Sequence, residues 1–382
     1  MNILFLLRSV SSGSGIDIVT KILANKFVNM NYNVNLCCLN FSDGSVSSKI
    51  KYFKIFGDWK KIDTLQNINI LKNTIQKENI NIIINQECQN IPWVNLVKIA
   101  TEKSDIKIIS CLHFPILMSI NHFAPRTRFF PRFFVRFIKK RKDLRAVNFA
   151  YDNSDFLVLL SEKFLEHYKK LQPKKDLSKL RIIANPLSMN IEKIDFEKKQ
   201  KTILFVGRIS EFQKRLSLII EVWKIILNTN KYNDWNLKIV GDGDDLNYIK
   251  KLANGLDRIS FEGFKNPNEY YAKSSIFLMT SAFEGFGITL IEAQNFGCVP
   301  IVMDSVSVFH DIIENMQNGI LTPDNDLKKF VEKLCLLMDN AELRKKMAEN
   351  GLKLIEKFSI DKILPEWEKL FSYAQGKNNA HI

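Results

Sequence analysis

Short, continuous apolar runs alternate with helical patterns along the whole of this chain. Strands with uninterrupted apolar residues are covered on both faces, as in a parallel sheet flanked by helices. Repeated strand–helix order therefore predicts doubly wound α/β architecture. The runs that we interpret as strands are Asn2–Leu7, Asn33–Leu39, Ile80–Ile84, Ile106–Leu112, Phe156–Leu160, Arg181–Ala184, Thr202–Val206, Leu237–Val240, Ile259–Glu262, Ile276–Met279 and Val299–Met303.

The length of 382 residues suggests two domains, at roughly 100–200 residues per domain. A polar, highly charged stretch at 188–201 follows the turn signal Asn185-Pro186 and has no clean periodicity. Ligands of open parallel sheets bind at the carboxyl ends of the strands, so we expect the site in loops that follow strands, in a cleft between two sheets. The predicted parts are an N-terminal α/β domain 1–190, a linker 191–201, a C-terminal α/β domain 202–355 and a C-terminal helical segment 356–382 that packs back on the first domain.

The composition limits the partners and the compartment. A net charge of +14 implies anionic partners, which include nucleic acid, a membrane surface and phosphorylated small molecules. The six cysteines form no C-x-x-C pair and no zinc-ligand spacing, which indicates buried thiols in a reducing compartment. The apolar run before Arg8 is too short for a signal peptide or a membrane span. We therefore expect a cytoplasmic protein, with peripheral contact to the cytoplasmic face of the inner membrane as a further expectation.

The most informative segment, 281–293, follows an expected strand and carries Glu284 and Glu292 around a glycine-rich turn. The helical pattern begins near Ile288, so the loop leads into a helix N-terminus, where amide groups and the helix dipole favour an anion. Carboxylates suit sugar hydroxyls because each accepts two hydrogen bonds. The alternative is coincidence, since glutamate is common near helix starts.

Two cations follow the expected strand Thr202–Val206. Arg208 and Lys214 can reach the same cleft from the end of that strand, and paired cations neutralise a pyrophosphate leaving group as its bond to a sugar breaks. The alternative is a solvated basic loop.

Together these residues resemble glycosyltransferase family 4, the retaining GT-B enzymes, over nearly the whole chain. The resemblance implies a GT-B fold of two Rossmann-like, doubly wound parallel-sheet domains that face a central cleft, an acceptor-binding domain at 1–190 and a nucleotide-sugar-binding domain at 202–355. The elements that carry it are Glu284 and Glu292 as E-x7-E, Val206–Arg208 with Lys214, Val240-Gly-Asp-Gly243, Gly297-Cys-Val-Pro-Ile301, Asn185-Pro186 and Asn318-Gly-Ile-Leu321.

The resemblance also implies roles for single residues. Glu284 would contact the transferred sugar. His113 would end a strand of the first domain and face the donor sugar. The alternative for His113 is a buried core histidine whose hydrogen bonds are satisfied within the protein. Arg208 and Lys214 would bind the donor diphosphate, and Glu292 would hold the ribose hydroxyls. The remaining donor-binding positions would be Gly285, Phe286, Gly287, Ile288, Thr289 and Leu290, with Gly15 as the second glycine of a Gly-Gly loop after the first strand.

The sequence departs from the family pattern at two places. Ser14 stands where the first glycine of that loop is expected, which affects loop geometry and acceptor contacts. The spacing from Arg208 to Lys214 is one residue longer than in the commonest family version, which affects the reach of the lysine.

The implied reaction is retaining transfer of a hexose or N-acetylhexosamine, with a UDP-sugar favoured over a GDP-sugar. The implied acceptor is lipid-linked or an oligosaccharide, in bacterial surface-polysaccharide assembly. Because no Asp-x-Asp metal motif lies in a plausible loop, we expect no cofactor and no metal, with Arg208, Lys214 and the helix end in place of a divalent ion.

A basic aromatic segment at 126–145 holds nine cations and one acid. Its phenylalanines recur every four residues and its cations fall on another face, which predicts a basic amphipathic helix. One interpretation is that this helix binds an anionic lipid surface and positions a lipid-diphosphate acceptor. The other is that it is a core helix whose phenylalanines pack inward and whose cations are solvated. The residues assigned to this surface are Arg126, Arg128, Phe129, Arg132, Phe133 and Arg136.

Three other functions fit parts of the pattern. A sugar-nucleotide epimerase or a phosphorylase would share the architecture. A nucleic-acid-binding protein fits the charge, but no helix-turn-helix, zinc or RNA-recognition signature is present, so we expect no nucleic-acid partner. A non-catalytic partner of a transferase would not need the acidic and basic site residues.

Overall fold

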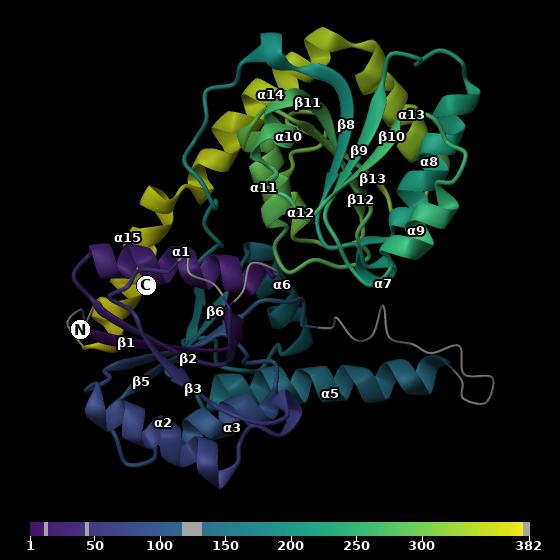
Figure 1. Cartoon of the computed structure of the whole chain (residues 1–382). Helices are drawn as coiled ribbons and strands as arrows, with labels where there is room; N and C mark the ends of the chain where they lie inside the picture. Colours follow the sequence, from purple (N-terminus) through teal and green to yellow (C-terminus); the bar gives the residue numbers. More distant parts are fainter. Residues whose placement is uncertain (11–13, 43–45, 117–131, 377–382) are drawn as a thin grey trace. The chain divides into compact units, whose positions relative to one another are not determined.

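The computed structural model describes residues 1–10, 14–42, 46–116 and 132–376, and for 132–139 it describes the backbone alone. The chain divides into two compact units (Figure 1). Unit 1 comprises Met1–Ser188 together with Ile363–Ile382, and unit 2 comprises Met189–Lys362.

Unit 1 is built on a seven-stranded parallel sheet with the order β3-β2-β1-β4-β5-β6-β7. The order runs outward from β1 in both directions, which is the doubly wound arrangement. Its elements are β1 (Asn2–Val10), α1 (Gly15–Asn29), β2 (Asn33–Phe41), β3 (Lys51–Lys54), α2 (Leu65–Lys77), β4 (Ile82–Asn85), α3 (Ile91–Ala100), β5 (Lys107–Leu112), α5 (Arg132–Asp152), β6 (Phe156–Leu159), α6 (Glu162–Leu171), β7 (Leu180–Ile182) and α15 (Ile360–Ala374).

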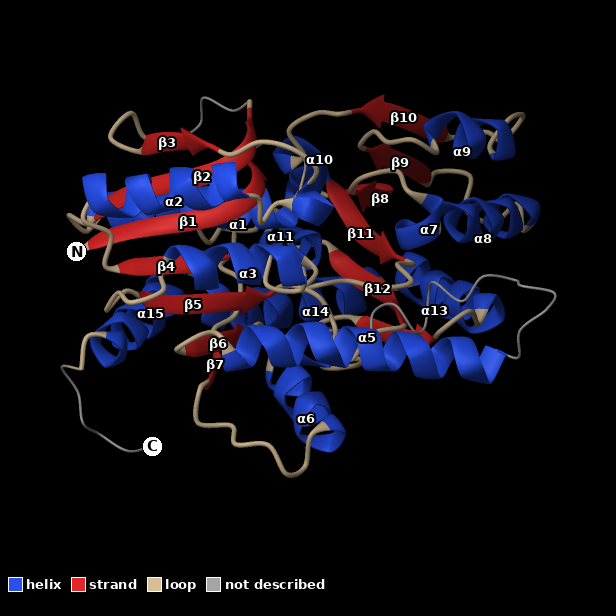
Figure 2. Cartoon of the chain, turned by 90° about the horizontal axis from the view of Figure 1, so that it is seen from below, coloured by secondary structure: helices blue, strands red, loops and turns tan. Residues whose placement is uncertain are grey.

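Helices cover both faces of the unit 1 sheet. On one face, Leu4 and Leu6 of β1 belong to a buried cluster with residues of α2 and α3, including the fully buried Trp93. On the other face, Phe5 stacks on Phe27 of α1 at a centroid distance of 6.0 Å. Figure 2 shows α2 and α3 in front of this sheet and α1 behind it. Since β1 is covered on both sides, its uninterrupted apolar sequence is explained.

The C-terminal helix α15 packs on α1 within unit 1. Trp367 and Phe371 of α15 contact Phe27 edge-on, at centroid distances of 6.0 and 5.2 Å. Both aromatic side chains of α15 are buried. This aromatic cluster ties the end of the described chain to its first helix.

Unit 2 is built on a six-stranded parallel sheet with the order β10-β9-β8-β11-β12-β13. Figure 1 shows α8, α9 and α13 on one side of this sheet and α10, α11 and α14 on the other. Its elements are β8 (Gln200–Val206), α7 (Glu211–Lys214), α8 (Leu216–Asn228), β9 (Asn236–Val240), α9 (Leu246–Leu252), β10 (Ile259–Gly263), α10 (Asn268–Lys273), β11 (Ser274–Met279), α11 (Ile288–Asn295), β12 (Val299–Asp304), α12 (Phe309–Ile312), β13 (Ile320–Pro323), α13 (Leu327–Asp339) and α14 (Ala341–Ile355).

All eleven apolar runs interpreted as strands overlap strands of the structure. The structure adds β3 and β13, which lie at sheet edges. The interpretation as two parallel, doubly wound α/β sheets is therefore confirmed.

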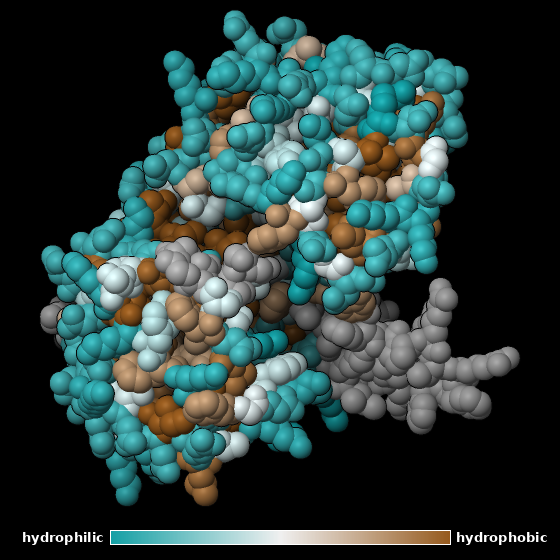
Figure 3. Space-filling view, in the orientation of Figure 1, coloured by the Kyte–Doolittle hydropathy of each residue, from teal (hydrophilic) through white to brown (hydrophobic). Residues whose placement is uncertain are grey.

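Hydrophilic side chains cover most of the visible face of unit 2, with smaller hydrophobic patches among them (Figure 3). No helix in the described part of the chain has both the length and the hydrophobicity that a bilayer crossing requires.

Candidate functional site

After two neighbouring parallel strands of unit 2, β8 and β11, the chain continues toward opposite sides of the sheet. From β8 the chain continues to β9 on one side, and from β11 it continues to β12 on the other. The loops that follow β8 and β11 therefore diverge at the carboxyl edge of the sheet, which is where open α/β sheets bind ligands. These two loops, 207–215 and 280–287, contain six of the residues that the sequence singled out, namely Arg208, Lys214, Glu284, Gly285, Phe286 and Gly287.

The structure brings Lys214 and Glu284 together. Lys214 Nζ lies 2.5 Å from Glu284 Oε1, and the two side chains are only 12% and 9% exposed. The Thr280 hydroxyl donates to the carbonyl of Lys214 at 2.9 Å, which fixes the backbone beside the lysine. A buried, hydrogen-bonded ion pair thus lies at the switch point of the sheet.

Gln213 joins the two loops next to this pair. Its carbonyl accepts from the Ala282 amide at 2.7 Å, and its side-chain amide donates to the Phe283 carbonyl at 3.4 Å. Arg208, which is exposed, donates to Gln213 Oε1 at 3.1 Å. Arg208 is therefore linked through Gln213 to the loop that carries Glu284.

Arg215 is a structural residue that the sequence analysis did not single out. It adopts the left-handed conformation, with φ of 50°, between α7 and α8. Its guanidinium donates to the carbonyls of Thr280 and Ser281 at 2.6 and 3.1 Å and pairs with Asp324 at 2.6 Å. This side chain therefore locks the start of the loop that follows β11.

Helix α11 begins at Ile288, as the sequence predicts, with Gly287 as its N-cap in the left-handed conformation at φ of 93°. The first amides of a helix have no acceptor within it. In α11 the Leu290 amide donates to the Gly287 carbonyl at 2.9 Å, so the Ile288 and Thr289 amides are the ones that the helix start can present to an anion. Phe286 is buried and its ring contacts Phe358, so any contribution to a ligand comes from its backbone.

Glu292 is the fifth residue of α11 and is 7% exposed. The hydroxyl of Tyr271, on α10, donates to Glu292 Oε2 at 3.1 Å. Burial, and secondarily the charge of Glu292, raises the pKa of Tyr271 well above its ordinary value, so the phenol stays protonated and acts as a donor. No sequence signal connected Tyr271 with Glu292, because the contact spans two helices.

The glycines of Val240-Gly-Asp-Gly243 allow the loops to approach closely. A Cβ on Gly241 would lie 1.9 Å from the Gly207 carbonyl oxygen, and one on Gly243 would lie 2.2 Å from that of Ile209. The Gly207 amide donates to the Val240 carbonyl at 3.0 Å. The backbone of this motif therefore packs directly against the loop that follows β8.

Two further motif positions are structural. Gly297 is left-handed at φ of 75° and ends α11 in a Schellman motif, in which its amide donates to Gln294 and that of Cys298 to Ala293. Asn318 is 1% exposed, and its side-chain amide donates to Gln294 Oε1 at 2.6 Å and to the Ile312 carbonyl at 2.9 Å.

In unit 1, His113 follows β5 and is 6% exposed. Its Nε2 lies 2.5 Å from Oε1 of Gln86, a residue that follows the neighbouring strand β4. Burial lowers the pKa of His113 to about 4, so the ring is neutral at neutral pH. With Gln86 as acceptor, the proton of the neutral ring lies on Nε2.

Gly15 is the first residue of α1, and Ser14 is the N-cap. The Ser14 hydroxyl accepts from the Asp17 amide at 3.2 Å. The serine that departs from the family pattern thus caps the helix that follows β1.

The basic aromatic segment is described only in part. Arg126, Arg128 and Phe129 lie outside the described residues. Arg132, Phe133 and Arg136 belong to α5, where the backbone alone is described.

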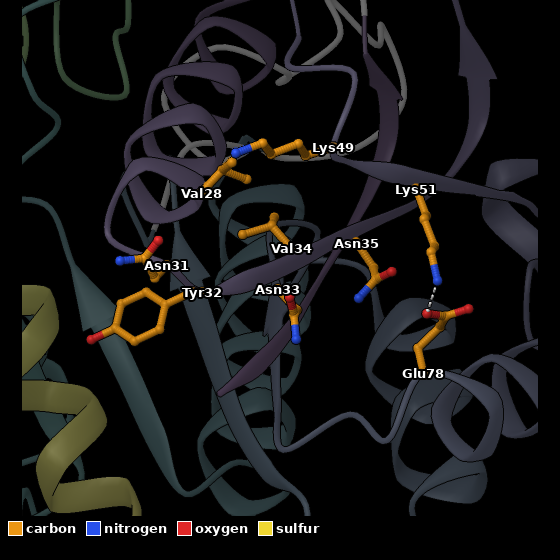
Figure 4. A pocket seen from close by; sticks show the side chains of 9 residues that line it. All are labelled: Val28, Asn31, Tyr32, Asn33, Val34, Asn35, Lys49, Lys51 and Glu78. Carbon is orange, nitrogen blue, oxygen red and sulfur yellow. Dashed lines mark hydrogen bonds and ion pairs between the residues drawn. The ribbon is translucent and has the colours of Figure 1, made fainter.

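A pocket of about 340 Å³ in unit 1 lies at the other edge of the sheet (Figure 4). Asn33 and Lys51 line it at the amino ends of β2 and β3, whereas His113 follows the carboxyl end of β5. The pocket and His113 therefore lie at opposite edges of the unit 1 sheet. The full lining of the pocket is Val28, Asn31, Tyr32, Asn33, Val34, Asn35, Lys49, Lys51 and Glu78.

In the described part of the chain, no three or more His, Cys, Asp or Glu side chains gather as metal ligands would.

Comparison with known proteins gives a family match in unit 2. Residues 189–354 match the family model of glycosyl transferases group 1. An uncharacterized glycosyltransferase of Haemophilus influenzae is 33% identical over 190 residues, which are 49% of this chain and about half, 53%, of that protein. Amylovoran biosynthesis glycosyltransferase AmsD of Erwinia amylovora is 26% identical over 381 residues, covering 97% of this chain and 99% of that protein.

The name of a third relative includes a lipid-linked glycan. The GalNAc-alpha-(1->4)-GalNAc-alpha-(1->3)-diNAcBac-PP-undecaprenol alpha-1,4-N-acetyl-D-galactosaminyltransferase of Campylobacter jejuni is 24% identical over 237 residues, or 60% of this chain and 62% of that protein.

Solved structures resemble the whole chain in fold. The lipopolysaccharide outer core galactosyltransferase WaaB in its apo form gives a TM-score of 0.70 at 20% identity, covering 98% of this chain and 100% of that one. Anabaena Alr3699/HepE in complex with UDP-glucose gives a TM-score of 0.75 at 17% identity, covering 97% and 100%.

Proposed function

We propose that this chain, which has the GT-B fold and whose residues 189–354 match glycosyl transferases group 1, is a glycosyltransferase that transfers a hexose or N-acetylhexosamine from a nucleotide sugar to a lipid-linked or oligosaccharide acceptor. The predicted GT-B fold is confirmed by the two parallel α/β sheets and the structural neighbours. The names of two relatives, amylovoran biosynthesis glycosyltransferase AmsD and the Campylobacter N-acetyl-D-galactosaminyltransferase, support a role in glycan biosynthesis for this chain.

The observation that carries the proposal is the Lys214–Glu284 pair beside the start of α11. A cation, a buried acid and a helix N-terminus gather where two strands diverge, at the edge that binds ligands in such sheets. This arrangement suits a ligand with an anionic part and a hydroxylated part, which is the chemistry of a nucleotide sugar.

In the proposed donor complex, Lys214 and Arg208 neutralise the diphosphate, and the Ile288 and Thr289 amides donate to its oxygens. Lys214 is already held by Glu284, so it is ordered before the donor arrives. Charge that develops on the departing diphosphate then meets donors already in place, which lowers the barrier to bond cleavage.

The two acids of the site take separate parts of the donor. We assign Glu284 to the hydroxyls of the transferred sugar and Glu292 to the ribose, since carboxylates accept hydrogen bonds from hydroxyl pairs. We favour UDP over GDP as the nucleotide. The UDP-glucose bound to HepE, a neighbour of the same fold, supports that preference.

The proposed reaction retains the anomeric configuration. The bond between the sugar C1 and the diphosphate oxygen breaks, and the acceptor hydroxyl oxygen attacks C1 from the same face. The leaving phosphate oxygen takes the hydroxyl proton, so the products are a nucleoside diphosphate and the glycosylated acceptor. Neutral His113 is proposed to face the donor sugar as a hydrogen-bonding group.

We also propose that the acceptor is presented at an anionic membrane surface by the basic aromatic segment 126–145. The undecaprenol-linked acceptor in the name of the Campylobacter relative supports a lipid-linked acceptor. Each cation near an anionic surface contributes about 1 kcal/mol to binding, so a cluster suffices for peripheral association.

The test is a screen of UDP-, GDP- and ADP-sugars by thermal shift and by nucleotide release, with wild type and Glu284→Gln. We expect one nucleotide class to raise the melting temperature, and Glu284→Gln to reduce turnover by about a hundredfold while the nucleoside diphosphate still binds. Unchanged turnover in Glu284→Gln would remove its assigned role, and no stabilisation by any of these donors would contradict the proposed function.

A further inference from the structure

We propose that Tyr271 is a positioning residue that fixes the Glu292 carboxylate for the two ribose hydroxyls of the donor, an inference that rests on the proposed function. The phenol itself does not touch the ligand. The phenol acts through one oxygen of the Glu292 carboxylate. It therefore increases the affinity only of a nucleotide that carries those hydroxyls.

The contact between the two side chains is well defined. Tyr271 is fully buried on α10, and its hydroxyl donates to Glu292 Oε2 at 3.1 Å. Its ring stacks on Phe296 at a centroid distance of 5.8 Å and an interplanar angle of 14°. The hydroxyl therefore has little freedom to leave the carboxylate.

The backbone of Tyr271 is fixed as well. Lys199 Nζ donates to its carbonyl at 2.9 Å, and Cys298 Sγ donates to the same oxygen at 3.1 Å. Lys199 lies just before β8 and Cys298 just before β12, so the tyrosine is tied to two parts of the unit 2 core. Both ends of the side chain are thus held before a ligand binds.

A carboxylate that must accept from two hydroxyls needs a defined plane, because each hydroxyl addresses a particular lone pair. A donor to Oε2 restricts rotation of that plane about the last side-chain bond of Glu292. Since burial keeps the Tyr271 pKa well above its ordinary value, this donor persists across the working pH range. Preorganisation of this kind appears as affinity, because less ordering remains for the ligand to bring about.

A purely structural role is the competing explanation. In that case the phenol only compensates the burial of Glu292, and its loss lowers stability without regard to which nucleotide binds. The two roles differ in one respect: a positioning role predicts a penalty that depends on the ribose hydroxyls.

The experiment measures the dissociation constants of UDP and of 2′,3′-dideoxy-UDP by calorimetry, for wild type and Tyr271→Phe, with the GDP or ADP pair in place of UDP if the donor screen selects that base. The substitution keeps the stacked ring and removes only the hydroxyl. We expect about a tenfold loss of UDP affinity in Tyr271→Phe and less than about a twofold change for the dideoxy analogue.

Tyr270→Phe is the matched control. Tyr270 is the adjacent residue, and its hydroxyl also donates to a glutamate, Glu262 Oε2, at 3.0 Å. Tyr270→Phe removes a similar hydrogen bond that lies outside the candidate site. We expect it to leave the affinities for both nucleotides unchanged, so that an effect of Tyr271→Phe cannot come from loss of any tyrosine–glutamate bond in this unit.

A second cycle tests the route of the effect. If Tyr271 acts through Glu292, then Tyr271→Phe has no further effect on UDP affinity in a Glu292→Ala background. Equal penalties for UDP and the dideoxy analogue, unchanged UDP affinity in Tyr271→Phe, or full additivity with Glu292→Ala would each overturn the positioning role. Failure of wild type to bind any nucleoside diphosphate would instead overturn the proposed function.

Discussion

Lys214 and Glu284 form an ion pair of 2.5 Å although 70 residues separate them in sequence. They come from the loops that follow two adjacent strands, and both side chains are almost buried. The same contact therefore has two consequences. It stabilises the junction of the loops, and it places a cation and an acid at the edge where open α/β sheets bind ligands.

Removing one member of this pair is expected to leave a buried charge without its partner. We predict that Lys214→Met and Glu284→Gln each lower the free energy of unfolding, by about 3 kcal/mol for Lys214→Met and by less for the isosteric glutamine. Turnover falls in both. Chemical denaturation and a nucleotide-release assay provide the measurements.

The double variant Lys214→Met/Glu284→Gln separates the two consequences. With both charges gone, stability is expected to recover most of the loss because no unpaired charge remains, whereas turnover stays low. A double variant that regains activity together with stability would show that the pair is structural only.

Gly241 provides a test of the close approach between loops. A Cβ at this position would meet the Gly207 carbonyl oxygen at 1.9 Å, and φ is +143°, so Gly241→Ala is expected to destabilise unit 2 by more than about 3 kcal/mol. Gly255→Ala is the matched control, since Gly255 also has a positive φ, +78°, but nothing lies within 4 Å of its added Cβ. Its expected cost is about 1 kcal/mol. Equal melting temperatures for the two variants would contradict this explanation.

Continuous apolar runs predicted the central strands because parallel strands with helices on both faces have no polar side. The same criterion missed β3 and β13. The β3 sequence Lys-Tyr-Phe-Lys has no fully buried residue, and β13 ends in an exposed proline. Both lie at sheet edges, where one neighbour is absent and the pressure for an all-apolar sequence is weaker.

At the candidate site, local patterns predicted the start of α11, because a glycine-rich turn before a helix is encoded in one segment. Residues that act through distant contacts were missed. Arg215 reaches the carbonyls of Thr280 and Ser281, and Gln86 reaches His113 across neighbouring strands. Such contacts depend on which strands are adjacent, and no spacing along the chain shows that.

The basic aromatic segment leads to a membrane prediction. Vesicles with anionic lipid should co-sediment wild type, and the Arg126/Arg128/Arg132/Arg136 alanine variant should bind much more weakly, since about 1 kcal/mol is lost per cation. A control that removes four exposed lysines of unit 2 (Lys224, Lys250, Lys251 and Lys328) keeps the change in net charge equal. Equal binding by wild type and the arginine variant would remove the lipid interpretation.

Metal dependence is a separate prediction. If cations and helix amides stabilise the leaving diphosphate, transferase activity should be unchanged after treatment with a chelator and gel filtration. The comparison is made with the same sample after magnesium or manganese is restored. A strict requirement for either ion would contradict the assignment of Lys214 and Arg208 to this role.

His113 makes the stability of unit 1 depend on pH. Its pKa is about 4 in the folded protein, below the ordinary 6.5 that applies when the chain is unfolded. Between these values the unfolded state binds more protons, so the contribution is fully present above pH 6.5 and is lost as pH falls toward 4. The loss amounts to about 3 kcal/mol, at about 1.4 kcal/mol per unit of pKa.

Urea unfolding of wild type and His113→Gln, at about pH 7 and about pH 4.5, isolates the contribution of His113 because other titrating groups are common to both proteins. We expect wild type to lose more stability than the variant on acidification, and equal losses would show that the histidine is not held neutral by burial.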